Sequence, residues 1–266
     1  MQYIGALIGD YCGSKYEWAN FQGELNDRME LLESGKFTDD SVLTVAIMDW
    51  LVHNGPNGVI TVGEFLKMWA KQYPKAGYGG RFRDWVASES YDPINSFGNG
   101  AGMRVSACAY YANTLEECLE LAKASAEVTH NHPEGIKGAQ AIAEAIYLAR
   151  SGASKDGIRQ VIEEDFGYDL SKSLDEIGRR AHRFDATCQV TVPEAIICFL
   201  NSQNFLDAIR VAIWIGGDSD TIAAMAGSIA EAYYGIPSYV EEKIKEKLPQ
   251  DMRDVISKFN EVMLKR

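Results

Sequence analysis

The strongest constraint on this chain is that its apolar residues recur with the period of a helix, while strand-like alternation is rare and short. In the segment 192–200 the apolar side chains fall at positions i, i+3, i+4, i+7 and i+8, and the segments 43–51 and 205–213 repeat this spacing. Glycine and proline stop signals such as Gly55-Pro56 and Gly216-Gly217 follow the periodic runs. No internal repeat or Pro/Ser-rich linker divides the chain. We therefore expect an all-α fold, with one compact domain over residues 1–266 and roughly ten or more helices.

One predicted helix differs from the others in composition. Residues 222–232 are small or apolar almost all round, and a helix with such a surface is usually central in its domain. Its amino end follows the sequence GGDSDT at positions 216–221. These polar residues are therefore expected to lie deep in the protein.

The net charge narrows the choice of partner. The chain has 26 Lys and Arg against 38 Asp and Glu, which gives a formal net charge of −12. A nucleic-acid binder needs a basic face, and none stands out here. We expect neither nucleic acid nor an anionic membrane as a partner. An acidic chain that binds a phosphate ligand must offset charge with a metal, backbone amides or a few placed cations.

The cysteines and the amino-terminal residues bear on the compartment. The five cysteines are an odd number with no C-x-x-C spacing, which argues against a disulfide framework and against a structural zinc site. The first residues carry no basic stretch, and no apolar run approaches the ~18 residues of a membrane span. We expect a cytoplasmic protein.

Two acid clusters stand at predicted helix starts, and each combines two carboxylates with a hydroxyl. Their members are Thr38, Asp39, Asp40, Asp218, Asp220 and Thr221. Helix capping needs only one such side chain at each start. A second buried aspartate costs on the order of several kcal/mol unless a positive group pairs with it. No Lys or Arg lies between Arg210 and Lys243.

An all-oxygen ligand set of this kind suits a hard cation such as Mg²⁺, Ca²⁺ or Mn²⁺ rather than zinc. Four carboxylates exceed what one Mg²⁺ usually takes from a protein, whereas two metals about 3.5–4 Å apart would use them. Capping of the two helices is the alternative interpretation. Nearby, Glu17 is by itself typical of a surface glutamate, and Asp10 in its apolar segment is a candidate for a buried polar anchor.

Two further segments suggest ligand binding. Residues 95–104 contain three alternating glycines before a predicted helix, and exposed backbone amides at such a turn suit a phosphate. Phe97 beside the turn could stack on a base, while a simple tight turn is the alternative. The sequence THNHPEG at 129–135 suggests zinc at first sight, but no cysteine or third histidine is near. A histidine that orients a ligand phosphate or hydroxyl is the preferred interpretation, and a helix-junction histidine is the alternative.

Together these segments resemble the ADP-ribosylglycohydrolase family, the all-α hydrolases that include the dinitrogenase-reductase-activating glycohydrolase. The similarity is collinear from Gly5 to Pro237. It rests on GALIGDYCGSKYE, FTDDS, FGNGAGMR, THNHPEGIKGAQA and GGDSDTIAAMAG followed by YYGIP. Any one of these motifs is modest, but five in order are specific.

The resemblance implies a dinuclear centre of two Mg²⁺, or Mn²⁺ in their place. The implied metal ligands are Thr38, Asp39, Asp40, Asp218, Asp220 and Thr221. The implied catalytic residues are Asp39, Asp40, Asp220 and Glu17, the last as a glutamate that gates the metal site. The implied ADP-ribose-binding residues are Ser96, Phe97, Gly98, Asn99, Gly100, Met103 and His130. Phe97 takes the position of the aromatic residue that stacks on adenine.

The function implied is hydrolysis of the bond between C1″ of ADP-ribose and an acceptor, so the partner is an ADP-ribosylated protein or a small ADP-ribose conjugate. One alternative is a hydrolase of a free conjugate such as O-acyl-ADP-ribose. Another is a catalytically silent relative that binds ADP-ribose or serves structurally. A carboxylate beside two cations has a lowered pKa that suits a base, so Glu17 is expected to transfer a proton. Asp92 is a further candidate for this proton transfer, because it lies close to the glycine turn in the sequence.

Overall fold

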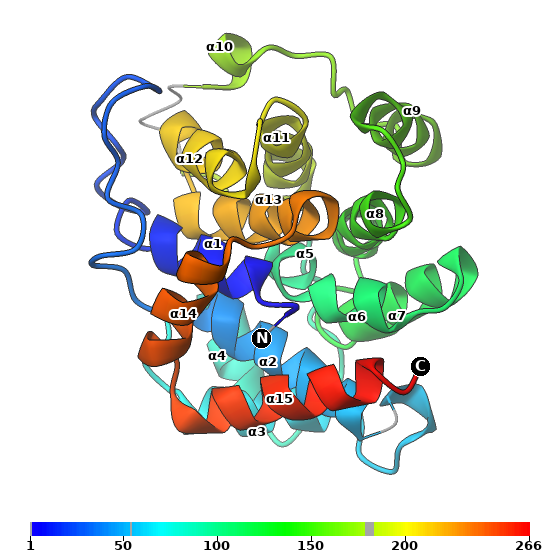
Figure 1. Ribbon diagram of the computed structural model, residues 1–266. Coiled ribbons are helices and arrows are strands. Elements are labelled where there is room, and N and C mark those ends of the chain that lie inside the picture. Colours follow the sequence, from blue (N-terminus) through cyan, green and yellow to red (C-terminus); the bar gives the residue numbers. More distant parts are fainter. Residues whose placement is uncertain (1, 54, 179–183) are drawn as a thin grey trace.

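In the computed structural model, which describes residues 2–53, 55–178 and 184–266, the secondary structure is helical (Figure 1). Within these ranges there is no strand, and the pairing of Gly98 with Thr187 is an isolated antiparallel bridge. The predicted all-α fold is therefore confirmed. None of the helices in the described ranges is both long and apolar enough to cross a membrane.

The helices of the described residues are, in chain order, α1 (Gly5–Gly13), α2 (Asp39–Val52), the 3₁₀ helix η1 (Gly55–Asn57), α3 (Val62–Gln72), α4 (Gly80–Ala87), α5 (Gly100–Arg104), α6 (Ser106–Tyr111), α7 (Leu115–Glu127), α8 (Pro133–Arg150), α9 (Lys155–Phe166), α10 (Leu174–Ile177), α11 (Cys188–Leu200), α12 (Phe205–Ile215), α13 (Ser219–Tyr234), α14 (Ser238–Lys247) and α15 (Gln250–Met263).

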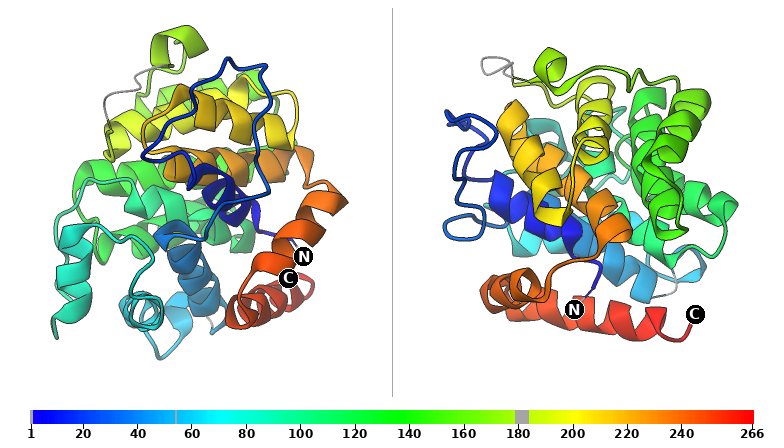
Figure 2. Two further views of the ribbon diagram at one scale, coloured as in Figure 1. Left: turned by 90° about the vertical axis from the view of Figure 1, so that its left-hand side faces the viewer. Right: turned by 45° about the horizontal axis from the view of Figure 1, so that its top comes forward.

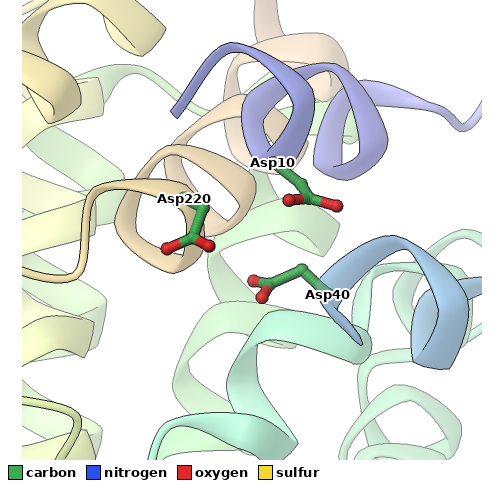
Figure 3. A group of neighbouring side chains, drawn as sticks. All are labelled: Asp10, Asp40 and Asp220. Atoms are coloured by element: carbon green, nitrogen blue, oxygen red, sulfur yellow. The ribbon is translucent and has the colours of Figure 1, made fainter. Parts of the chain in front are cut away.

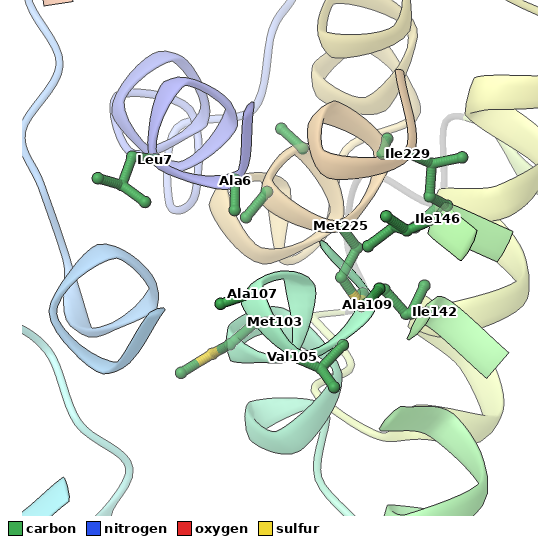
Figure 4. Packing of buried hydrophobic residues seen from close by; sticks show 14 of the residues in the cluster. Ala6, Leu7, Met103, Val105, Ala107, Ala109, Ile142, Ile146, Met225 and Ile229 are labelled. Carbon is green, nitrogen blue, oxygen red and sulfur yellow. The ribbon is translucent and has the colours of Figure 1, made fainter. Parts of the chain in front are cut away.

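Helix α13 lies at the centre of the fold, as its small residues predict. Every residue from Ser219 to Glu231 is buried. In Figure 1 the helices α1, α8, α11 and α12 surround α13, whereas α9, α10 and α15 lie at the periphery. Figure 4 shows Met225 and Ile229 of α13 directed toward Ile142 and Ile146 of α8. The central helix therefore organises the hydrophobic core.

Helix α1 packs against α13 so closely that Gly5 and Gly9 of α1 have no room for a side chain. A Cβ atom added at Gly9 would come within 2.0 Å of the Ala223 carbonyl oxygen. The same test gives 2.4 Å between Gly5 and the Gly227 oxygen. These glycines are spaced four apart and share one face of α1. The backbones can touch only because this face has no side chains.

A hinge of two glycines connects α12 to α13. Gly216 and Gly217 have φ angles of 77° and 78°, in the left-handed region where residues with a Cβ are strained. The Gly217 amide donates a hydrogen bond to Asn20 Oδ1 at 3.1 Å. This bond ties the hinge to the segment 14–38, which loops outward beside α1 and α12 (Figure 2). The start of α13 is thereby set against the end of α1.

The five cysteines are free and buried, in agreement with the odd number and the absence of paired spacings. They are Cys12 of α1, Cys108 of α6, Cys118 of α7, and Cys188 and Cys198 of α11. Burial raises the pKa of each thiol, to about 12 for Cys108 and for Cys188. The thiols are therefore protonated at neutral pH.

The pH dependence of stability gives a test of the contact between α1 and α13. The Glu231 carboxylate accepts hydrogen bonds from the Tyr3 and Gly5 amides, each at 2.6 Å. Burial nevertheless raises the pKa of Glu231 from 4.5 to about 7. The folded state thus holds a proton that the unfolded state releases. This contribution to stability is complete below about pH 4.5 and is lost as the pH rises through about 7.

Glu231→Gln should therefore flatten the decline of the free energy of unfolding between pH 4.5 and 8, by an amount on the order of 3 kcal/mol. Urea denaturation at several pH values measures this slope. Glu116→Gln, at an exposed position in the first turn of α7, is the control and should leave the slope unchanged. Equal slopes in native protein and Glu231→Gln would contradict the assignment.

Candidate active site

Two helix starts bring the predicted acid clusters together. Asp39 and Asp40 open α2, while Asp218 directly precedes α13 and Asp220 lies in its first turn. Thr221 Oγ1 donates to Asp40 Oδ2 at 3.2 Å and so links the two helix starts directly. Each carboxylate thus lies at the positive end of a helix dipole. The convergence of the clusters, 178 residues apart from Asp40 to Asp218, is what the sequence predicts.

Asp10 of α1 is the buried polar anchor of this arrangement. Its carboxylate accepts hydrogen bonds from the Thr38 amide at 2.8 Å and from Thr38 Oγ1 at 2.7 Å. It also accepts from the amide and the hydroxyl of Ser41. Figure 3 shows Asp10, Asp40 and Asp220 pointing toward one another from three helices. Asp10 therefore fixes the start of α2 against α1.

Burial raises the pKa of every aspartate in the cluster, and for some of them neighbouring carboxylates raise it further. Burial is the largest cause throughout, because a carboxylate loses its hydration. The pKa rises to about 6 for Asp10 and Asp218, to about 7 for Asp39, and well above the ordinary value for Asp40 and Asp220. Neighbouring carboxylates raise the pKa of the last three further. The cluster therefore carries a large negative charge when its carboxyl groups are ionised.

The donor set fits a hard divalent cation. Oxygen atoms of Asp10, Asp40 and Asp220 lie within 4.8 Å of one another, as do those of Glu17, Asp218 and Asp220. Asp40 Oδ1 is buried and accepts no hydrogen bond from the described residues. No ion pair in the described ranges joins a Lys or Arg to these aspartates. Buried carboxylates without cationic partners are the ligands that Mg²⁺ and Mn²⁺ take.

A cavity of about 420 Å³ opens onto both clusters, which is a size typical of small-molecule sites. Most of the predicted site residues line it, namely Glu17, Asp39, Asp40, Ser96, Gly98, Asn99, Gly100, Met103, His130, Asp218, Asp220 and Thr221. Thr38 and Phe97 do not line it. Thr38 lies behind the cavity surface, where it caps α2 and contacts Asp10.

The glycine turn also borders the cavity and is held by neighbouring groups. The Gly98 amide donates to Ser96 Oγ at 3.2 Å, and the Asn99 amide donates to the Ala186 carbonyl at 2.8 Å. Asn99 Nδ2 donates to Asp218 Oδ2 at 2.7 Å. The turn is thereby joined to the aspartate cluster. Two of its amides are already paired within the protein, so they do not serve as free donors.

The two histidines of the THNHPEG segment have separate roles. His130 is 6% exposed and lines the cavity beside Gly98 and Gly100. His132 instead caps α8, where its side chain accepts a hydrogen bond from the Glu134 amide. The His-x-His pair therefore does not form one ligand set.

The aromatic side chains at the cavity differ from the prediction. Phe97 is 42% exposed, and its ring lies against that of His132, with ring centroids 5.4 Å apart. Trp18 and Phe184 do line the cavity, and their rings stack at 4.9 Å. No spacing or motif marks this pair, because Trp18 and Phe184 meet only through the tertiary fold. The adenine-stacking role of Phe97 stays a prediction.

Glu17 lies at the edge of the aspartate cluster and is half-buried. In the protein itself its pKa is raised, mainly because burial removes water, while the nearby Lys36 lowers it. Two bound cations, by contrast, are expected to lower the pKa of Glu17. Asp92 does not line the cavity; its carboxylate accepts a hydrogen bond from Ser90 Oγ. The geometry thus favours Glu17 over Asp92 as the proton-transfer group.

The chain is similar to proteins whose names describe ADP-ribosyl hydrolases. The profile of the ADP-ribosylglycohydrolase family matches residues 3–266. ADP-ribosylarginine hydrolase Tri1 of Pseudomonas putida is 27% identical over 97% of this chain and 78% of its own. Human ADP-ribosylhydrolase ARH3 is 26% identical over 89% of this chain and 85% of its own. ADP-ribosyl-[dinitrogen reductase] glycohydrolase of Rhodospirillum rubrum is 24% identical over 94% of this chain and 91% of its own.

A solved structure, described as an ADP-ribosylglycohydrolase-related protein complex, has the same fold. It superimposes with a TM-score of 0.70 at 21% identity and covers 98% of this chain and 97% of its own.

Asp40→Asn should stabilise protein stripped of divalent cations. The substitution removes a carboxyl group whose ionised form is unfavourable where it is buried, while an amide oxygen can still accept from Thr221. We expect the free energy of unfolding in EDTA at pH 7.5 to rise by ~1 kcal/mol or more. The exposed control Asp84→Asn should change it by less than ~0.5 kcal/mol. A loss of stability in Asp40→Asn would contradict mutual repulsion within the cluster.

Proposed function

Since the chain belongs to the ADP-ribosylglycohydrolase family, we propose that it hydrolyses the bond between C1″ of ADP-ribose and an acceptor group, releasing the acceptor unmodified. The observation that carries this proposal is the pairing, in one cavity, of buried carboxylates with a glycine turn. The carboxylate end suits ribose hydroxyls and a reacting water. The end formed by the turn and His130 suits the diphosphate. The substrate is an ADP-ribosylated protein or a small ADP-ribose conjugate.

We further propose that the reaction depends on two Mg²⁺, or on Mn²⁺ in their place. The residues that would hold them are Thr38, Asp39, Asp40, Asp218, Asp220 and Thr221. The unpartnered Asp40 Oδ1 and the raised pKa of the aspartates support this assignment. When bound, the cations supply neutralising charge and polarise the oxygen atoms of the ligand.

The side chains of the protein have separate tasks in this reaction. Asp10 holds Thr38 in place, so the start of α2 keeps its position when the aspartates ionise. Asn99 orients Asp218 through its amide group. Glu17, at the cavity edge, takes a proton from the reacting water. Such positioning lowers the entropic part of the barrier to hydrolysis.

The nature of the acceptor decides how much acid assistance the leaving group needs. A guanidine leaves readily when protonated, whereas a serine alkoxide needs a general acid. One relative is named as a hydrolase of ADP-ribosylarginine, and another as a glycohydrolase of ADP-ribosylated dinitrogen reductase. Hydrolysis of O-acyl-ADP-ribose is the alternative reaction, and silent ADP-ribose binding is the alternative without catalysis. The complete acid set favours catalysis, since binding alone does not need four clustered carboxylates.

Asp220→Asn should abolish hydrolysis, because it removes a carboxylate shared by both oxygen groups of the cluster. The assay uses ADP-ribosyl-arginine, ADP-ribosyl-serine peptide and O-acetyl-ADP-ribose, each with Mg²⁺, with Mn²⁺ and with EDTA. We expect turnover of at least one substrate, lost in EDTA and in Asp220→Asn. Asp84→Asn, on an exposed helix face, should behave as native protein. Turnover that survives both EDTA and Asp220→Asn would exclude the mechanism, and ADP-ribose binding without any turnover would support the silent relative.

Glu17→Gln should lower kcat by about 10²–10⁴-fold with a much smaller change in KM, because the amide cannot accept the proton. Glu30→Gln is a matched control in the same loop, where Glu30 forms an exposed ion pair with Lys15. Steady-state kinetics on the preferred substrate provide both constants. Near-normal kcat in Glu17→Gln would assign the proton transfer to another group.

A further inference from the structure

Arg104, at the end of α5, is a fully buried cation whose guanidinium pairs with no carboxylate of the described residues. Its Nη2 donates to the Ser125 carbonyl and to Thr129 Oγ1, both at 2.9 Å. Its Nε and Nη1 have no partner in the described ranges. Burial lowers the pKa of Arg104 to about 10, so the group is charged at neutral pH. A buried positive charge therefore adjoins the cavity, which Arg104 also lines.

Thr129 connects this charge to His130. Thr129 Oγ1 lies 2.8 Å from His130 Nδ1 and is itself completely buried. A guanidinium can only donate hydrogen bonds, so the Thr129 oxygen accepts from Arg104. The single hydroxyl proton of Thr129 then points to His130 Nδ1. If Nδ1 carried the proton instead, the Thr129 hydroxyl would be a buried donor with no acceptor, which is unfavourable.

The donor count thus determines the state of the imidazole. Nδ1 accepts from Thr129, so the ring proton is on Nε2. Burial, followed by the charges of Arg104 and Arg81, lowers the pKa of His130 well below its ordinary value, which agrees with a neutral ring. Nε2 has no hydrogen-bond partner among the described residues, although the side chain is 94% buried.

The free Nε2–H faces the glycine turn. A Cβ atom on Gly100 would lie 3.0 Å from Nε2, and one on Gly98 would lie 3.8 Å away. The absence of side chains at these positions leaves Nε2 open to the cavity. The amides of Gly98 and Asn99 are already paired, so His130 is a preferred donor for a ligand at this turn.

We propose that Arg104 and Thr129 are positioning residues that hold His130 as a neutral Nε2–H donor to an anionic oxygen of the ligand at the glycine turn. The ligand chemistry is a phosphate ester, and its identity as the diphosphate of ADP-ribose rests on the proposed function. Because Thr129 sets the direction of the proton, the loss of its hydroxyl releases the ring to exchange tautomers. Arg104 acts on His130 indirectly, through its hydrogen bond to Thr129.

The state of the ring is measured by ¹⁵N NMR of the 266-residue chain, with His130→Asn used to assign the signals. In native protein we expect an unprotonated Nδ1 and a protonated Nε2 at pH 7. Thr129→Val keeps the shape but removes the hydroxyl, and should give averaged shifts of two tautomers. Thr129→Ser should restore the native pattern. Thr191→Val, a buried threonine of α11 that bonds the Thr187 carbonyl, is the matched control.

The binding of ADP-ribose is measured by calorimetry on the same proteins. We expect Kd to rise about tenfold in Thr129→Val, equivalent to ~1.4 kcal/mol, and to return to the native value in Thr129→Ser. A protonated Nδ1 in native protein, or native shifts and Kd in Thr129→Val, would overturn the proposal. Native protein that has the expected tautomer but binds no ADP-ribose would contradict the proposed function. The role of His130 as a donor to that ligand would then fail as well. The effect of Thr129 on the ring would still stand. The NMR result therefore separates the two failures.

Discussion

The structure depends on the close approach of α1 and α13, whose backbones touch because glycines line the contact. Gly9 leaves no room for even a methyl group against Ala223. This approach sets Asp10 of α1 beside the starts of α2 and α13, where the other carboxylates stand. Had larger side chains separated the helices, the acid groups would lie too far apart to share a ligand. The packing of small residues is thus the reason why residues from both ends of the chain form one site.

The site combines two electrostatic environments within a single cavity. At one end the aspartates are crowded and buried, so their ionised form is unfavourable without a cation. At the other end the buried charge of Arg104 lies behind His130, although the chain carries a net charge of −12. An acidic protein can therefore accept an anion without any basic surface. Asn99 joins the two ends through its bond to Asp218.

Much of this arrangement could be predicted from the sequence, because it follows from local patterns. Helical periodicity indicated the fold class, the small residues of 222–232 indicated the central helix, and acid pairs at helix starts indicated the cluster. The positions of Trp18 and Phe184, the pairing of the Asn99 amide with the Ala186 carbonyl and the burial of Arg104 depend on contacts between distant segments. No spacing encodes such contacts. Gly5 and Gly9, four residues apart, are a sequence signal of close helix packing, whereas the identity of the partner helix is known only from the structure.

The buried thiols have a consequence for how the motions of this protein can be observed. Thiolate is the species that reacts with alkylating reagents, and burial keeps these five groups protonated. Modification therefore requires a helix to open first. Because the cysteines lie on α1, α6, α7 and α11, each of these four helices carries an intrinsic reporter of its own opening. The rate at which Cys12 becomes labelled would register the transient separation of α1 from its neighbours, without any introduced probe.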